Sequence, residues 1–257
     1  MRSLIVALCA LTLLAATTAC EGSAPSVSAR AESHAPLDYI VRLTGGAQDS
    51  EALPMVLVLH GRGDRPANFT KRLEGFGERA RFIYLEAPVD EGKGRGWFTF
   101  DRGPGGWKRT SDKVKTLGER VVVTLNRLEE KYRTVGKPVI TGFSQGSMVL
   151  FAAILSHPDR FSFALPVSGA LFESILPENL QAIAPALPPV IAFHGDEDPI
   201  IPARASRQAV SILSEAGARA QVRTFPEIPH WIMGEMKSNL LEELARCLAA
   251  SVAAVAK

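Results

Sequence analysis

The segment from Pro138 to Ser147 constrains the fold of this 257-residue chain more than any other. Apolar residues Val139 and Ile140 lead into the turn Gly-Phe-Ser-Gln-Gly at 142–146, and a helical run follows directly. A strand, a Gly-x-Ser-x-Gly turn and a helix in this order predict a serine that projects from a sharp turn, where glycines avoid collisions with both neighbours. The free N–H groups at the start of the helix are directed toward the serine side chain, where negative charge would develop. The segment therefore predicts a nucleophilic Ser144, with a purely structural tight turn as the alternative.

The composition suits one large α/β domain or two small ones. The chain is 46% hydrophobic and 22% charged, and a chain of this length can bury a full core. Its 29 basic and 27 acidic residues give a net charge of +2. A nucleic-acid-binding protein would show a clustered basic excess, so we expect no nucleic-acid partner. Three cysteines do not form a disulfide framework.

The N-terminal residues predict an export signal followed by a linker. Residues 1–19 combine a positive start, an apolar run from Leu4 to Leu14 and small residues, which is typical of a signal peptide. Cys20 follows the small residues, as in a bacterial lipoprotein signal, although Thr17 stands where Leu is usual. We therefore expect a bacterial envelope lipoprotein, on the periplasmic side or the cell surface, held to the membrane by a lipid at Cys20. A secreted protein is the alternative. Residues 20–36 are rich in Ser, Ala and Pro and predict a flexible tether.

The remainder, residues 37–257, alternates strand and helix patterns. Strands are expected at residues 38–43, 55–59, 82–86, 138–142, 163–168, 190–193 and 221–225. Helices are expected at residues 67–79, from Ser111 or Asp112 onward, after Ser144 to 156, and at 176–184, 203–216 and from 237. This alternation predicts a mainly parallel sheet with helices on both faces. Loops near residues 60, 144, 198 and 230 all follow strands, so they should converge at the carboxyl edge of the sheet.

Residues 87–111 read as a long glycine-rich loop, which is usually functional or mobile. The loop carries four large aromatic residues: Trp97, Phe98, Phe100 and Trp107. Its tryptophans either line a pocket or pack the loop onto the body of the domain. Its basic residues favour a solvated face, and the alternative is an anionic substrate or surface.

A serine hydroxyl becomes a good nucleophile when a base removes its proton and an acid orients that base. His230 is the expected base, because it lies in a loop after the final strand. The acid should precede it, and both Asp196 and Asp198 lie in the right loop. Asp198 is preferred because Pro199 and the apolar residues after it would fix the backbone there, and Asp196 is the alternative.

The reaction also needs N–H donors for the developing oxyanion, which commonly lower a barrier by ~3–4 kcal/mol. The N–H of Gln145, directly after the nucleophile, is one expected donor. The loop His60-Gly-Arg-Gly63 lets the backbone approach closely, so the N–H of Arg62 is the expected second donor.

Taken together, these motifs resemble those of the carboxylesterases, phospholipase-type esterases and acyl-protein thioesterases of the α/β-hydrolase fold. The resemblance spans roughly residues 38–250 and rests on His-Gly-x-Gly-Asp at 60–64, Gly-Phe-Ser-Gln-Gly at 142–146, His-Gly-x-x-Asp-Pro at 194–199 and Pro-His at 229–230. It implies a cofactor-free serine hydrolase with nucleophile Ser144, acid Asp198, base His230 and oxyanion donors Arg62 and Gln145.

The chain also departs from the pattern of that family. Ser147 replaces a second Gly, Thr99 stands where Asp is common, and Trp231 replaces a small polar residue after the histidine. The loop at 87–111 looks longer than usual. These changes leave the chemistry intact and bear on the substrate, for which the expected contacts are Trp97, Phe143, Ile200 and Trp231.

The expected function is hydrolysis of small-molecule or envelope carboxylic esters through an acyl-enzyme on Ser144. Because no lid domain is evident, short-chain or aryl esters are favoured. The same triad could instead act on a thioester, a polyester, a feruloyl ester or a peptide. Two further hypotheses do not use the triad: a catalytically silent envelope-binding lipoprotein, and a metal hydrolase using His60, His194 and His230. No His-x-His or His-x-x-x-His spacing supports a metal, so none is expected.

Overall fold

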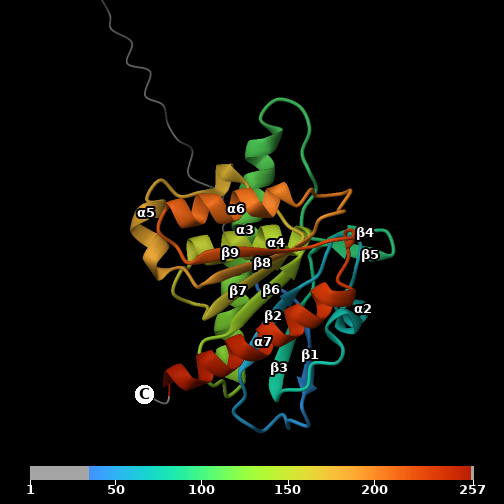
Figure 1. Ribbon diagram of the computed structural model, residues 1–257, viewed down its shortest axis with the longest axis vertical. Coiled ribbons are helices and arrows are strands. Elements are labelled where there is room, and N and C mark those ends of the chain that lie inside the picture. The colour runs from blue at the N-terminus through green and yellow to red at the C-terminus, as the bar shows by residue number, and fades with distance from the viewer. Residues whose placement is uncertain (1–34, 256–257) are drawn as a thin grey trace, which may run out of the picture.

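The computed structural model describes residues 35–255 (Figure 1). The predicted signal peptide at 1–19, Cys20 and nearly all of the predicted tether lie outside the described residues, so export and lipid attachment stay predictions. No helix within 35–255 has the length and apolar content that crossing a membrane would require.

A seven-stranded sheet forms the centre of the domain, in the order β1-β3-β2-β6-β7-β8-β9. In this sheet only β1 is antiparallel to its neighbour, and the other described pairs are parallel. The strands are β1 Tyr39–Thr44, β2 Met55–Leu59, β3 Ala80–Leu85, β6 Val139–Phe143, β7 Phe163–Val167, β8 Val190–Gly195 and β9 Ala220–Phe225. Every residue of β2, β3 and β8 is buried, as expected for strands covered on both faces. The predicted α/β class with a mainly parallel sheet is confirmed.

Helices cover both faces of this sheet and bury two separate apolar cores. One core is shared by α3 Gly106–Lys131, α4 Gln145–Ser156 and α6 Arg204–Glu215. The other lies under α7 Gly234–Val255, α2 Pro66–Phe69 and the 3₁₀ turn η1 Thr70–Leu73. Figure 1 shows α7 crossing in front of the sheet. Shorter turns are η2 Glu173–Ile175, α5 Leu180–Ile183 and η3 Ala184–Ala186.

The helix expected at 67–79 is much shorter in the structure. It consists of α2 and η1, and it ends at Leu73. The backbone leaves the helical conformation at Glu74, which is extended with a ψ of 138°, and Gly75 follows with a φ of +99° that other residues rarely adopt. The helix expected at 176–184 is likewise shorter: it is reduced to α5, which begins after Pro177 and is followed directly by the turn η3 that contains Pro185. The last helix begins at Gly234, three residues earlier than expected.

The segment at 87–111 is also more ordered than the sequence suggested. A hairpin of β4 Val89–Glu91 and β5 Gly94–Gly96 occupies its first part. Helix α3 then begins at Gly106, so neither Ser111 nor Asp112 caps it. Gly105 caps it instead, with a φ of +69° that other residues rarely adopt. The Ser111 hydroxyl lies inside the helix and donates a hydrogen bond to the Trp107 carbonyl at 2.8 Å.

Candidate active site

Ser144 lies at the sharp turn between β6 and α4, as the sequence predicted. Its φ of 55° and ψ of −118° are unusual for a residue with a side chain, and such conformations typically cost ~1–3 kcal/mol. The surrounding structure holds this conformation: the Ser144 N–H donates to the Val167 carbonyl at 2.9 Å. A Cβ atom on Gly146 would approach the Leu59 carbonyl oxygen to 2.3 Å, so the strand β2 packs directly against the turn.

Three side chains far apart in the sequence meet at this turn. His230 Nε2 lies 3.0 Å from the Ser144 hydroxyl oxygen, and His230 Nδ1 lies 2.6 Å from Asp198 Oδ2. With a proton on Nδ1, His230 donates to the carboxylate and its Nε2 accepts from the serine hydroxyl. This series has the geometry by which a histidine removes a proton from a serine.

The structure brings Asp198, and not Asp196, to this histidine. The Asp198 side chain is fully buried, and its Oδ1 accepts the backbone N–H groups of Ile200 and Ile201 at 2.9 and 2.8 Å. These two bonds leave Oδ2 free to face His230. Asp196 instead lies 3.3 Å from Arg207 at the surface. The preference for Asp198 over its neighbour therefore has a structural basis in the turn that follows it.

A second histidine contacts the same carboxylate, and sequence reasoning missed it. His194 Nε2 lies 3.2 Å from Asp198 Oδ2 and 2.7 Å from the Ile201 carbonyl, while Nδ1 lies 2.7 Å from the Ser206 hydroxyl. Burial lowers the pKa of His194, which favours the neutral ring. On sequence grounds His194 entered only as part of the His-Gly-x-x-Asp-Pro motif and of the metal hypothesis. Its position four residues before Asp198 was the available signal.

Two backbone N–H groups beside Ser144 are available to a ligand. Gln145 is the first residue of α4, so its N–H has no acceptor within the helix. Within residues 35–255 the Arg62 N–H has no acceptor either. Gly61 brings the second loop close, because a Cβ atom there would lie 2.8 Å from the Phe143 ring and 3.6 Å from Ser144 Cβ.

The loop at 60–64 is fixed by the β4–β5 hairpin. The Gly63 N–H donates to the Arg95 carbonyl at 2.7 Å, and the Arg95 N–H donates to the Asp64 carbonyl at 2.8 Å. The Arg62 side chain is directed to Glu91 of the hairpin, at 2.9 Å. This loop therefore takes its shape partly from a neighbouring element.

Trp97 packs inside the domain, and its burial argues against the expected contact with substrate. Its side chain is 1% exposed, and its indole N–H donates to the His60 carbonyl at 2.7 Å. The Gln145 side chain holds the same segment, accepting the Trp97 N–H at 3.0 Å and donating to the Phe98 carbonyl at 2.9 Å. Trp97 thus ties the loop at 60 to the segment that follows β5.

The other three expected substrate contacts lie at the mouth of the site. The Phe143 ring is half-buried and packs 4.8 Å from the His230 ring. Ile200 and Trp231 are 68% and 44% exposed. The Arg72 guanidinium lies 3.6 Å above the centre of the Trp231 ring. Phe143 thus lies beside the histidine of the site, Ile200 and Trp231 are exposed close in sequence to Asp198 and His230, and their contact with a substrate stays a prediction.

The histidines named in the metal hypothesis have other partners. His60 Nδ1 faces the Gly61 carbonyl at 2.7 Å, and its Nε2 accepts the Ala87 N–H at 3.2 Å. Across residues 35–255, no three His, Cys, Asp or Glu side chains gather as a metal would require. Each of the three histidines is therefore engaged by other groups in this structure.

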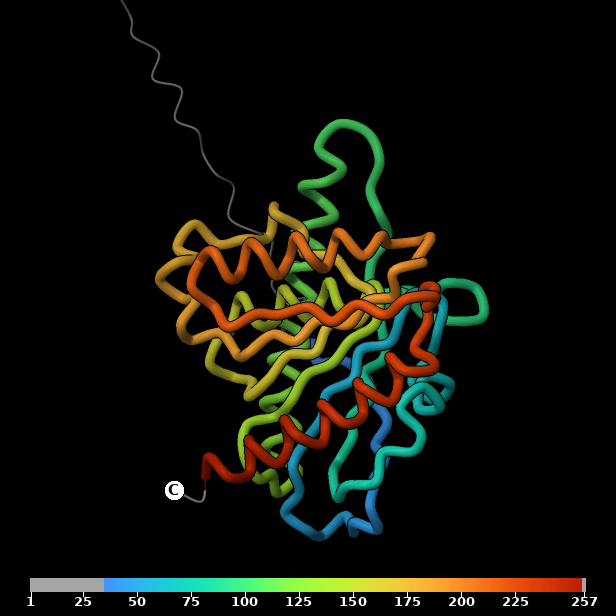
Figure 2. The backbone as a smooth tube through the Cα atoms, viewed as in Figure 1, coloured from blue at the N-terminus to red at the C-terminus, as the bar shows by residue number. Residues whose placement is uncertain are grey.

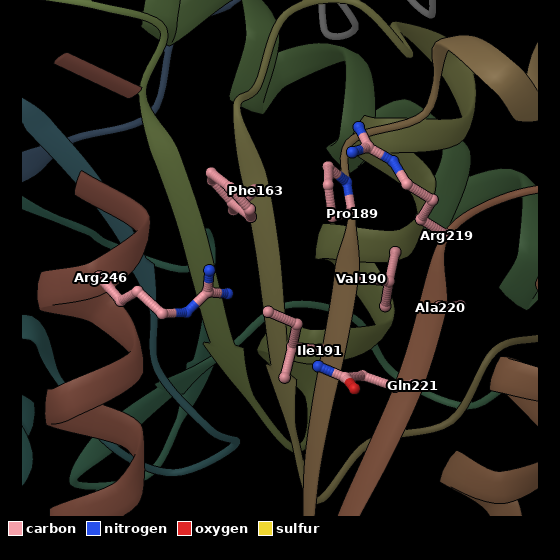
Figure 3. Close-up of a pocket in the computed structure, with 8 residues that line it drawn as sticks. All are labelled: Phe163, Pro189, Val190, Ile191, Arg219, Ala220, Gln221 and Arg246. Atoms are coloured by element: carbon pink, nitrogen blue, oxygen red, sulfur yellow. The ribbon is translucent and has the colours of Figure 1, made fainter. Parts of the chain in front are cut away.

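Figure 3 shows a hollow of about 430 Å³ that is separate from this site. It is lined by the first residues of β7, β8 and β9, namely Phe163, Val190 and Ala220, and by Arg219 and Arg246. It therefore lies at the amino ends of these strands, whereas Ser144, Asp198 and His230 lie beyond carboxyl ends. The two locations are at opposite edges of the sheet.

A mainly parallel sheet that brings Ser, His and Asp together at its carboxyl edge defines an α/β hydrolase. Residues 46–248 match the family model described as phospholipase/carboxylesterase, so the chain belongs to that family. The predicted family resemblance and the prediction of a carboxylic ester hydrolase are thereby confirmed.

Known proteins support the same placement. The chain is 28% identical over 183 residues to acyl-protein thioesterase 1 of Kluyveromyces lactis. The aligned region covers 63% of this chain and 76% of the relative. In structure it is similar to esterase PE8, with a TM-score of 0.68, 20% identity and coverage of 83% of this chain and all of that one. The Bacillus cereus carboxylesterase aligns with a TM-score of 0.64, 16% identity and coverage of 86% and 100%. The two structural likenesses concern the fold alone.

Proposed function

We propose that this enzyme hydrolyses carboxylic esters through an acyl-enzyme intermediate on Ser144. The observation that carries the proposal is the continuous hydrogen-bonded series from the Ser144 hydroxyl through His230 to Asp198. A serine without such a base is a weak nucleophile at neutral pH.

The first half of the reaction forms the acyl-enzyme. His230 Nε2 takes the proton of the Ser144 hydroxyl as the oxygen attacks the acyl carbon. The negative charge that develops on the carbonyl oxygen accepts the N–H groups of Arg62 and Gln145, at the positive end of helix α4. His230 then gives its proton to the leaving alcohol oxygen, and the bond between that oxygen and the acyl carbon breaks.

The second half repeats the same steps with water. His230 removes a proton from a water molecule, whose oxygen attacks the acyl carbon. The bond to Ser144 breaks, the serine oxygen recovers a proton from His230, and the free acid leaves. Asp198 stays ionised throughout, holds the ring in one tautomer and stabilises its charged form.

For the substrate we propose short-chain or aryl esters, as expected from the sequence. The aromatic and apolar side chains at the mouth, Phe143, Ile200 and Trp231, are placed to contact an apolar acyl or aryl group. A thioester is the second candidate, favoured by the similarity to the Kluyveromyces lactis acyl-protein thioesterase. Both substrates would use the same acyl-enzyme.

Replacing the nucleophile tests the mechanism. Ser144→Ala should lower kcat for p-nitrophenyl acetate by a factor on the order of 10⁶ while the circular dichroism spectrum is retained. Ser156→Ala is the matched control, because Ser156 is exposed at the far end of the same helix. Normal turnover by Ser144→Ala would refute the proposed role of Ser144.

A substrate panel separates the two candidates. We expect kcat/KM to fall as the acyl chain of p-nitrophenyl esters lengthens. Acyl thioesters matched in chain length should be cleaved more slowly than the esters. Faster cleavage of the long-chain thioesters would favour the second candidate over the first.

A further inference from the structure

Exposed large apolar side chains gather on a few segments of the described residues. Six are exposed in the described residues: Phe100, Trp107, Ile200, Trp231, Met233 and Val255. Ile200, Trp231 and Met233 follow Asp198 and His230 closely in the chain, Phe100 and Trp107 lie between β5 and the first turn of α3, and Val255 ends α7. Clustered exposed apolar residues often mark a surface that meets another molecule.

Two of these residues are aromatic and lie on one segment, which we call the aromatic loop, residues 97–109. Trp107 and Phe100 are 68% and 45% exposed. Their ring centres lie 6.3 Å apart, and that of Trp107 lies 6.1 Å from that of Phe172. Figures 1 and 2 show the green segment that carries them projecting beyond the rest of the domain. The loop thus presents aromatic rings outward.

Uncompensated positive charges accompany these rings. Lys108 pairs with Asp112 at 2.8 Å, and Lys113 pairs with Asp101 at 2.8 Å. Within the described residues, by contrast, neither Arg102 nor Arg109 has a carboxylate partner. The Arg109 guanidinium donates to the carbonyls of Pro104 and Arg102, at 2.9 and 3.1 Å. Two arginines of the aromatic loop therefore carry a charge that no carboxylate of the described residues pairs.

Hydrogen bonds hold the aromatic loop next to the nucleophile. The Gln145 side chain binds the backbone of Trp97 and Phe98, and Gln145 directly follows Ser144. The Asp101 N–H donates to the Thr110 hydroxyl at 3.0 Å. Because the loop is already ordered, a partner would not have to bear the entropy cost of ordering it.

We propose that the aromatic loop docks on the surface of an anionic phospholipid bilayer. Tryptophan is favoured at the boundary between headgroups and acyl chains, where one part of the ring is apolar and the N–H is hydrated. Guanidinium groups bind phosphate oxygens. Docking here would place the mouth of the site at the lipid surface.

The charges also argue against a second copy of the chain on this surface. A symmetric dimer would place the same patch against itself. Arg102 and Arg109 of each copy would then face like charges in a partly desolvated contact. An anionic surface pairs these charges instead.

Quenching of Trp107 fluorescence tests the proposal. The full chain carrying Ser144→Ala, which excludes hydrolysis, is mixed with vesicles of phosphatidylcholine and phosphatidylglycerol that carry brominated acyl chains. We expect quenching with these vesicles and much less with phosphatidylcholine alone. Trp97 is buried but Trp231 is 44% exposed, so Trp231→Phe is introduced into the same chain, and Trp107→Phe should then remove the quenched component. This readout reports the loop itself, whatever else holds the chain to the vesicle.

A matched pair of charge variants tests the specificity. Arg102→Gln should raise the concentration of anionic vesicles needed for half-maximal Trp107 quenching about fivefold. Arg219→Gln, an exposed arginine at the opposite edge of the sheet, should leave it unchanged. Absence of Trp107 quenching, equal effects of the two variants, or equal quenching by neutral vesicles would overturn the proposal. A dimer in solution that Trp107→Phe dissociates would assign the surface to a second copy. No turnover is measured, so the result does not depend on the role of Ser144.

Discussion

At the scale of single residues, the Asp198 carboxylate is held from three directions. Its Oδ1 accepts two backbone N–H groups, while its Oδ2 faces both His230 and His194. A buried carboxylate with this many partners keeps one orientation. His194 is therefore a positioning residue for the proposed reaction, acting through Asp198.

His194→Ala should lower kcat about tenfold with little change in KM, because His194 Nε2, whose N–H the Ile201 carbonyl accepts at 2.7 Å, also lies 3.2 Å from Asp198 Oδ2. His194→Gln keeps a donor and an acceptor and should recover part of the rate. The decisive measurement is a double-mutant cycle with Asp198→Asn, in which the effect of His194→Ala should largely disappear. An undiminished effect in the Asp198→Asn background would mean that His194 acts by another route.

At the scale of elements, helix α4 meets the loop after β7 through Ser147. This serine stands where relatives of the resembled family usually have glycine. Its hydroxyl oxygen accepts the Val167 N–H at 2.9 Å and lies 2.5 Å from the Gly142 carbonyl. A Cβ atom on Gly169 would lie 2.2 Å from Ser147 Cβ, so the glycine accommodates the serine.

Gly169→Ala should destabilise the protein by ~1–3 kcal/mol, as overpacking does. Ser147→Gly removes the colliding atom, and the next contact, with the Ser144 carbonyl oxygen at 3.5 Å, is ordinary. The double variant should therefore be more stable than Gly169→Ala alone. Urea unfolding of the unmodified protein, the two single variants and the double variant gives the free energy of unfolding of each. Simple additivity of the two single changes would contradict the proposed collision.

The sequence could predict those elements whose side-chain pattern follows from burial. The apolar runs of β2 and β8 and the turn at Ser144 were predictable because both faces of those strands are covered. The start of α3 was not, because Ser111 looks like a cap while the positive φ of Gly105 decides the start. The burial of Trp97 was not predictable either, since an aromatic residue in a loop carries no signal of depth.

In the candidate site, too, some contacts could be predicted from the sequence and others could not. Chain order and strand ends indicated which residues would meet at Ser144, and the structure places those side chains within hydrogen-bonding distance. The contact between His194 and Asp198 depends on how the turn from Asp198 to Ile201 folds back. A single sequence holds no pattern that reports such a turn.

At the scale of the whole molecule, two buried histidines couple stability to pH. His60 and His194 are 1% and 0% exposed, and burial lowers the pKa of both. Below their ordinary pKa of about 6.5, the unfolded chain binds protons that the folded chain does not. The free energy of unfolding should therefore be highest above that pH and fall as the pH drops below it.

Urea unfolding between neutral and mildly acidic pH measures this slope. We expect His60→Gln, in which the amide can still accept the Ala87 N–H, to flatten the decrease in stability at acidic pH. His157→Gln is the control, since His157 lies near the surface 2.8 Å from Glu119. If the unmodified protein, His60→Gln and His157→Gln showed the same pH dependence of stability, His60 would not be a source of the decrease at acidic pH.

The bonds between the loop at 60–64 and the β4–β5 hairpin have a practical consequence for exchanging parts between relatives. Gly63 and Asp64 share backbone bonds with Arg95, and a Cβ atom on Gly94 would lie 1.8 Å from the Gly63 carbonyl oxygen. A chimera that imports a foreign hairpin without its cognate loop would misalign the Arg62 amide. These two pieces, separated by about thirty residues of chain, form one transplantable module.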